Sequence, residues 1–139
     1  MDKIYLHKNN NLELVLEKNN LYFTILSTGF NNIDYLHFLE KTELFFEKCI
    51  KTDLHFNFII DITKVSILLI NNIFDYTYKT SVFLKKHDTF FETNLNKNII
   101  IIKNKFNKKI FSYLFGFYKP KRPIEFVKNY NELNNYIND

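Results

Sequence analysis

The residues that could do chemistry are few in this sequence, and they form no recognisable catalytic pattern. The four histidines, His7, His37, His55 and His87, fall on different predicted elements. The sequence has no Gly-rich phosphate loop, no Gly-x-Ser-x-Gly elbow and no paired-histidine zinc motif. Catalysis requires a positioned acid, base or nucleophile. We therefore expect a protein that is not an enzyme, with no catalytic residue, no metal site and no cofactor.

Asp61 is the carboxylate with the most suggestive position, because it comes near the end of the apolar run 55–62. Open α/β sheets place binding sites at the carboxyl ends of their strands. The alternative is that Asp61 caps the loop that follows it, which is a common role for an aspartate at a strand end. No second carboxylate converges with it in the local sequence, so we expect the capping role.

Cys49 is the only cysteine, which excludes an internal disulfide framework and a multi-cysteine zinc site. We expect it to be a small apolar residue on a helix face, in a reducing compartment. No apolar run approaches the roughly 20 residues of a membrane-spanning helix, and no signal-peptide core follows Met1. The expected protein is intracellular and soluble, in the cytoplasm, an organelle or a virion.

Composition predicts a single globular domain over residues 1–139, because 46% of the residues are hydrophobic and 24% are charged. The abundance of Asn, Lys, Ile and Phe is typical of an AT-rich genome. The charge is uneven: residues 97–139 carry nine of the 19 Lys and Arg residues and three of the 15 acids. A basic C-terminal third can attract nucleic acid or another polyanion. The candidate polyanion-binding residues are Lys119, Lys121 and Arg122, which the flanking prolines should hold extended.

The pattern of elements predicts an α/β fold with a mixed open sheet. Three β-rich runs joined by Asn pairs, at 3–8, 12–17 and 21–26, indicate N-terminal antiparallel hairpin strands. Strands and helices then alternate, which predicts βαβαβα crossovers. The predicted helices cover 33–51, about 70–87, about 104–116 and 131–138; the predicted strands cover 55–62, 98–103 and 124–127.

The predicted inner faces of the helices follow from apolar spacing. Residues 88–98 are expected to be a polar connection without helix. We expect the following residues to pack inward: Leu36, Leu39, Phe46 and Ile50 in the first helix; Ile70, Ile73, Phe74, Thr77, Ser81 and Leu84 in the second; Phe106, Ile110, Leu114 and Phe117 in the third, with Tyr113 and Tyr118 also assigned to the core.

Two local patterns and the element order give a family resemblance. The run Ile59-Ile60-Asp61-Ile62-Thr63-Lys64-Val65-Ser66 is similar to an apolar strand leading into an Asp-x-Ser-type turn. Residues 109–115, followed by 124–127 and 132–133, are similar to a closing helix, strand and helix. From about 21 to 137 the chain resembles a STAS domain, the fold of the anti-sigma factor antagonists. The resemblance implies an interaction module that binds proteins and performs no catalysis.

The phosphorylation motif of the switch members is absent. In those members a Ser or Thr preceded by Asp and followed by Gly starts the second helix, where a phosphate can repel an acidic partner. The corresponding stretch here, Leu68-Leu69-Ile70-Asn71-Asn72, has no hydroxyl, acid or glycine. The resemblance therefore implies constitutive binding.

Two functions remain open. The first is a STAS-like protein-interaction module, with Lys64, Ser66, Asn71 and Asn72 as the candidate partner-binding residues at the turn and the start of the second helix. The second is a structural subunit of a large assembly, such as an organellar ribosome or a virion, whose basic C-terminal third contacts nucleic acid or neighbouring subunits. We expect a protein partner in either case; the sequence does not predict the oligomeric state.

Overall fold

A computed structural model describes residues 2–137. The strands are β1 (Lys3–Lys8), β2 (Leu12–Glu17), β3 (Asn20–Ile25), β4 (Phe56–Asp61), β5 (Leu95–Ile101) and β6 (Ile124–Val127). The helices are α1 (Asn32–Thr52), the 3-10 turn η1 (Ile67–Leu69), α2 (Ile73–Lys86), α3 (Asp88–Asn94), α4 (Lys105–Phe117) and α5 (Tyr130–Ile137). Asn138, the predicted end of the closing helix, lies outside the described residues.

The six strands form one sheet in the order β1-β2-β3-β4-β5-β6. β1, β2 and β3 pair antiparallel, and the pairs from β3 to β6 are parallel. This topology confirms the predicted α/β class with N-terminal hairpins followed by helical crossovers. The β2–β3 turn differs in one detail: Lys18, and not an asparagine, takes the left-handed conformation, with φ of 57°.

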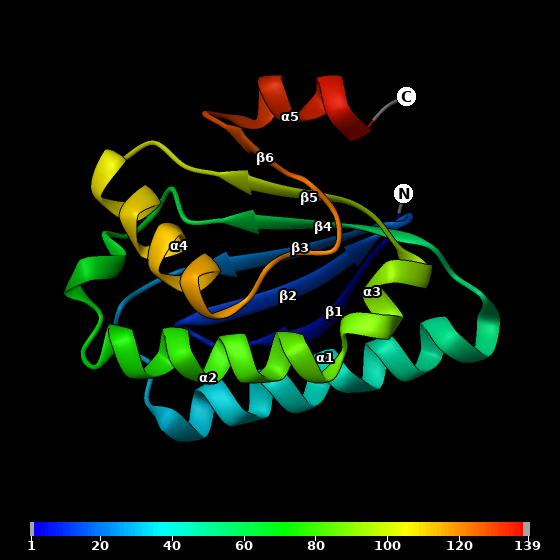
Figure 1. The fold of residues 1–139 in the computed structure, drawn as a ribbon, viewed down its shortest axis with the longest axis horizontal. Helices are drawn as coiled ribbons and strands as arrows, with labels where there is room; N and C mark the ends of the chain where they lie inside the picture. The colour runs from blue at the N-terminus through cyan, green and yellow to red at the C-terminus, as the bar shows by residue number, and fades with distance from the viewer. Residues whose placement is uncertain (1, 138–139) are drawn as a thin grey trace.

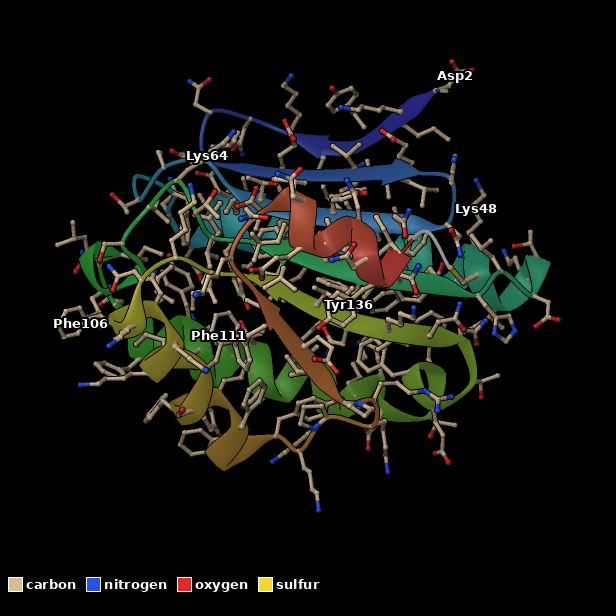
Figure 2. All side chains as sticks on the ribbon, turned by 90° about the horizontal axis from the view of Figure 1, so that it is seen from above. Asp2, Lys48, Lys64, Phe106, Phe111 and Tyr136 are labelled. Atoms are coloured by element: carbon tan, nitrogen blue, oxygen red, sulfur yellow. The ribbon has the colours of Figure 1, made fainter. Side chains whose placement is uncertain are left out.

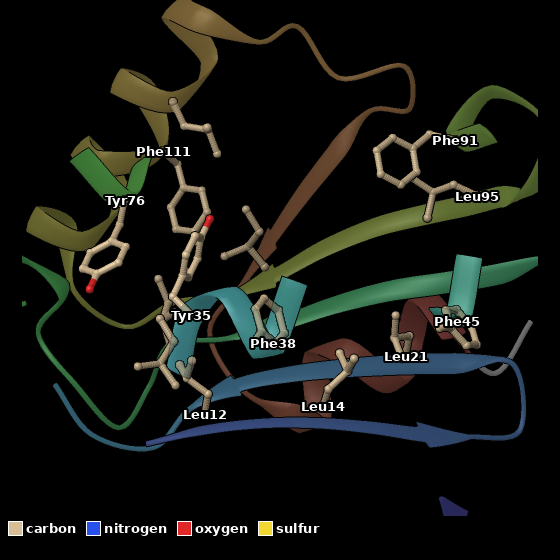
Figure 3. Close-up of a cluster of buried hydrophobic side chains, with 14 of the residues drawn as sticks. Leu12, Leu14, Leu21, Tyr35, Phe38, Phe45, Tyr76, Phe91, Leu95 and Phe111 are labelled. Carbon is tan, nitrogen blue, oxygen red and sulfur yellow. The ribbon is translucent and has the colours of Figure 1, made fainter. Parts of the chain in front are cut away.

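The sheet separates two layers of helices (Figure 1). α1, α2, α3 and α4 cover one face, where most of the core lies. On the other face, α5 packs Leu133 against Ile59, Ile99, Ile101 and Val127 of β4, β5 and β6. Figure 3 shows Leu12, Leu14 and Leu21 of the sheet among the aromatic side chains of the larger core. Alternate residues of β4, β5 and β6 therefore reach different cores.

α1 begins with a capping box between Asn31 and Asp34. Its inner face was predicted correctly in part: Phe46 is buried and Leu39 is partly buried against the core, whereas Leu36 is 50% exposed and Ile50 is 63% exposed. The face that contacts the sheet carries Tyr35, Phe38, Thr42, Phe45, Phe46 and Cys49. The rings of this face pack on rings of the sheet, with centroids 4.4 Å apart for Phe23–Phe38 and 5.2 Å apart for Phe45–Phe56.

Residues 88–98 are not a polar loop, which corrects the prediction. They form α3 and the start of β5, so β5 begins three residues earlier than predicted. Burial of Phe90 and Phe91 holds this short helix against the core, where the ring centroid of Phe90 lies 4.6 Å from that of Phe46. A polar sequence carrying two such rings is better explained as an amphipathic helix.

A cavity of about 170 Å³ lies between the sheet and helices α1, α2 and α4. Its walls include Phe23, Phe38, Ile60, Tyr76 and Phe111. Apolar cavities of this size stay dry, because a water molecule needs polar partners. The core beneath these helices is therefore less completely packed than the core beneath α5.

Candidate interaction surface on helices α2 and α4

The turn between β4 and α2 places the four predicted partner-binding residues at the surface. Lys64, Asn71 and Asn72 are exposed, and Ser66 is half-buried at the start of η1. Asn72 precedes α2 in a left-handed conformation, with φ of 61°, which asparagine tolerates better than most residues. The structure thus keeps these residues together in one exposed turn at the carboxyl end of β4.

Asn107 of α4 fixes this turn from below, a role that the sequence analysis missed. The Asn107 side chain accepts a hydrogen bond from the backbone N–H of Ile67 at 2.9 Å. Its amide Nδ2 donates to the carbonyl oxygen of Val65 at 3.1 Å and, at 3.5 Å, to that of Ile62. Only 1% of Asn107 is exposed, so these backbone groups depend on it for their bonds. An asparagine within the apolar stripe of a predicted helix was the available signal.

Two rows of aromatic side chains lie on the outer face of α2 and α4. Phe74 and Tyr78 of α2 contact Tyr113 and Phe117 of α4, with ring centroids 4.9 Å apart for Phe74–Tyr113 and 5.5 Å apart for Tyr78–Phe117. The pairs advance in the same direction along both helices, so the helices are parallel. We call these four residues the aromatic surface. Between 37% and 53% of each residue is exposed.

The sequence analysis assigned Phe74, Tyr113 and Phe117 to the core, and that assignment was wrong. Phe106, also predicted to be inside, is 56% exposed, and Figure 2 shows it projecting outward while Phe111 points inward. Of the two tyrosines assigned to the core, Tyr118 is buried as predicted and Tyr113 is not. Helical spacing identifies an apolar stripe without showing that a neighbour covers it.

Lysines mark both ends of the aromatic surface. Lys109 precedes Tyr113 by one helical turn, and Lys85 follows Val82 on the stripe that carries Tyr78. Neither lysine forms an ion pair with another residue in the range 2–137. The nearby carboxylate of Asp75 forms an ion pair with Lys79, with the Nζ of Lys79 3.0 Å from a carboxylate oxygen. The aromatic surface thus has unpaired positive charge at each end.

The predicted polyanion-binding residues serve different purposes in the structure. Lys119 is exposed, whereas the Nζ of Lys121 lies 3.4 Å from a carboxylate oxygen of Asp88. Arg122 donates through Nε to the carbonyl oxygen of Leu95 at 2.9 Å, and through a terminal nitrogen to that of Glu92 at 2.7 Å. Arg122 therefore closes the carboxyl end of α3, and only Lys119 is free for a ligand in the way the sequence analysis expected.

A different set of lysines lines a groove of about 500 Å³ at the carboxyl ends of β5 and β6. We call it the lysine groove. Its lysines are Lys103, Lys105, Lys108 and Lys128. All four are exposed, and none pairs with a carboxylate of the described chain. The groove therefore gathers four unpaired charges of the basic C-terminal third.

Asp61 has the expected capping role. Its Oδ1 accepts hydrogen bonds from the backbone N–H and the hydroxyl of Thr63, at 2.9 and 2.7 Å. Its Oδ2 accepts a third, at 2.6 Å, from the hydroxyl of Tyr130 at the start of α5. With 2% of Asp61 exposed, these bonds stabilise a buried carboxylate and attach α5 to the central strand.

Buried hydroxyls make the protein sensitive to alkali. Burial raises the pKa of Tyr35 to about 12. Burial, together with a hydrogen bond to a carboxylate, also raises the pKa of Tyr118 beside Asp88 and of Tyr130 beside Asp61. Each folded-state pKa lies above the unfolded value of about 10, so the folded state holds these protons more tightly. Their contribution to stability is complete below about pH 10 and declines as the pH rises further.

We therefore expect the free energy of unfolding, measured by urea denaturation, to fall as the pH rises from about 10 to about 12. Tyr130→Phe should show a shallower fall, because phenylalanine has no proton to lose. Tyr5→Phe, at an exposed position of β1, is the matched control and should retain the full slope. Equal slopes in the two variants would contradict the assignment to Tyr130.

The remaining candidate chemistry is limited within residues 2–137. No three His, Cys, Asp or Glu side chains in that range gather as metal ligands would. Among the helices described, none has the length and apolar character needed to cross a membrane. Comparison with known proteins identifies no matching family, no matching curated protein and no matching solved structure. The surfaces of this chain are therefore the basis for assigning a function.

Proposed function

We propose that this protein is a non-enzymatic, STAS-like protein-interaction module, and that its aromatic surface binds an amphipathic helix with acidic residues at both ends. The proposal is carried by the two contacting rows of rings, Phe74 and Tyr78 beside Tyr113 and Phe117, that lie in solvent. The ring pairs pack α2 against α4, yet between 37% and 53% of each residue remains exposed. Aromatic residues supply much of the binding energy in protein interfaces.

Charge identifies the kind of partner. Lys109 and Lys85 lie at opposite ends of the aromatic surface, so an apolar helix face flanked by carboxylates would complement it. A second copy of this chain would fit poorly. A two-fold pairing that aligns the rows of the two copies brings a lysine end against a lysine end, and like charges oppose association.

The turn of residues 64–72 extends this surface and supports the STAS-like part of the proposal. Leu69, which is 75% exposed, continues the apolar area beyond Phe74. In a phosphorylation switch the added charge at this turn would repel acidic groups of the partner. Because Leu68–Asn72 offers no hydroxyl, we propose constitutive binding that uses Lys64, Ser66, Asn71 and Asn72 at the rim of the surface.

The test begins with native purification and crosslinking from a photoreactive residue at position 78, followed by reconstitution with the purified partner. Phe74→Ser with Tyr113→Ser should weaken binding by about 30-fold or more, a loss of about 2 kcal/mol. The control is Ile33→Ser with Ile50→Ser, which removes exposed apolar side chains from α1. It should leave the affinity unchanged.

Two results would reject this proposal. One is a control variant that loses as much affinity as the α2–α4 variant. The other is a homodimer, detected by sedimentation, that Phe74→Ser with Tyr113→Ser dissociates, because the occupant would then be a second copy. Lys85→Glu with Lys109→Glu tests the charges. We expect weaker binding to the reconstituted partner, with a larger loss of affinity at low salt than at high salt.

We keep the structural subunit of an organellar ribosome or a virion as a second proposal, because the lysine groove gives the basic C-terminal third a defined concave surface. Co-purification with dozens of subunits of one particle would favour it. Co-purification with one stoichiometric protein would favour the interaction module.

A further inference from the structure

We infer that the lysine groove binds a ligand with adjacent phosphate groups, as found in a polyphosphate chain or along a single-stranded nucleic acid. The inference is independent of the aromatic surface. Four lysines from three segments meet there: Lys103 after β5, Lys105 and Lys108 in α4, and Lys128 after β6. The groove occupies the carboxyl edge of the parallel strands, where open α/β sheets bind ligands.

The charges in the groove are not neutralised by carboxylates of the described chain. In ordinary surface patches lysines alternate with carboxylates, but none of these four is paired within residues 2–137. The carboxylate of Glu132, four residues after Lys128, accepts a hydrogen bond from the backbone N–H of Lys128 at 2.8 Å. Four like charges that converge without a partner repel one another, and a bound polyanion would remove this repulsion.

Two of the lysines also oppose the dipole of α4. Lys105 and Lys108 lie in its first turns, where negative side chains are favourable and positive ones are not. α1, α2, α3 and α5 carry an acid in the first turn, at Asp34, Asp75, Asp88 and Glu132. The lysines of α4 therefore lower the stability of the helix that carries them, as residues retained for binding often do.

The ligand is recognised through its charge and not through stacked bases. The aromatic ring in the groove belongs to Phe126, and the Nζ of Lys108 lies over it, 4.7 Å from the centroid. A base could not stack on that face without displacing the ammonium group. We therefore expect binding that depends steeply on salt and weakly on base identity.

The experiment measures binding of two probes by the full chain: inorganic tripolyphosphate, and a single-stranded oligothymidylate of about 12 nucleotides. The variant is Lys105→Glu with Lys108→Glu. Because glutamate suits the first turns of α4, its melting temperature should equal or exceed that of the native protein. We expect at least a tenfold loss of affinity, and a salt slope for the oligonucleotide that is shallower by about 0.7 for each phosphate contact removed.

The control is Lys41→Glu with Lys48→Glu on α1, which changes the net charge equally. Figure 2 shows Lys48 at the opposite end of the molecule from Phe106, which follows Lys105 in the first turn of α4. Loss of binding in the groove variant alone supports the site, and the probe that binds shows whether a free polyphosphate or a nucleic acid supplies the phosphates. Equal loss in both variants, or no binding of either probe at about 50 mM salt, would overturn the inference.

Discussion

Phe46→Ala should lower the free energy of unfolding by about 3–5 kcal/mol, the largest effect we expect from a single substitution. Only 2% of Phe46 is exposed. Its ring centroid lies 4.6 Å from that of Phe90 and 5.3 Å from that of Phe91, and 5.0 Å from that of His87. The alanine variant loses these contacts and leaves a void that the surrounding rings cannot fill without leaving their rotamers.

Urea denaturation of the variant and of Ile50→Ala makes the comparison. Ile50 lies on the same helix with 63% of its surface exposed, so its truncation should change stability by no more than about 0.5 kcal/mol. If both variants lost the same amount, the loss would reflect helix propensity and not packing. Phe46→Leu should recover part of the stability, because it restores apolar volume to the site.

Asn107→Leu should cost about 2–4 kcal/mol and should loosen the turn between β4 and α2. Leucine has the same number and branching of heavy atoms as asparagine, but its methyl groups are bulkier and it has no polar atom. The substitution leaves the N–H of Ile67 and the carbonyl oxygens of Val65 and Ile62 without the bonds that Asn107 supplies. A buried backbone group left without a hydrogen-bond partner costs more stability than an average hydrogen bond contributes.

Hydrogen exchange provides the specific measurement, since the amide proton of Ile67 should exchange faster in Asn107→Leu than in the native protein. The control is Asn71→Leu, an exposed asparagine of the same turn with no side-chain bond in the part of the chain that the structure describes. It should change neither the stability nor the exchange of Ile67. Unchanged protection of Ile67 in Asn107→Leu would show that the turn is held by its own backbone.

The sheet could be predicted because its strands give simple signals. Leu12, Leu14 and Leu16 alternate with polar or smaller residues, and the run 99–102 is apolar at every position, as a strand buried on both faces requires. The turns contain asparagine, and each parallel strand is followed by a helix. These local patterns determine the order of the elements and, with the short connections, the topology.

The faces of the helices were harder to predict. In α1, apolar residues occur on both sides of the helix. A stripe that joins Phe46 to Leu36 and Ile50 therefore fits the sequence as well as the buried stripe, which joins Phe46 to Phe38. The choice depends on which surface the neighbouring strands present. Sequence periodicity contains no information about the neighbour, and the burial of large rings decided the outcome.

The same reason explains what could be predicted of the candidate site. Lys64 lies in the connection after the central strand, as predicted, whereas Asn71 and Asn72 were placed at the start of a helix from about 70 that in the structure begins at Ile73. The aromatic surface was missed because Tyr113 and Phe117 have the spacing of core residues. Arg122 was assigned to a ligand because the sequence could not show that the carboxyl end of α3, itself unpredicted, lay within its reach.

The cavity beneath α1, α2 and α4 makes the two layers of the protein mechanically unequal. Hydrostatic pressure favours whichever state has the smaller volume, and the void of about 170 Å³ disappears when water fills it or when the chain unfolds. The layer that yields first under compression is therefore the one whose outer face carries the aromatic surface. A partner bound across α2 and α4 would hold those helices together and make the layer stiffer.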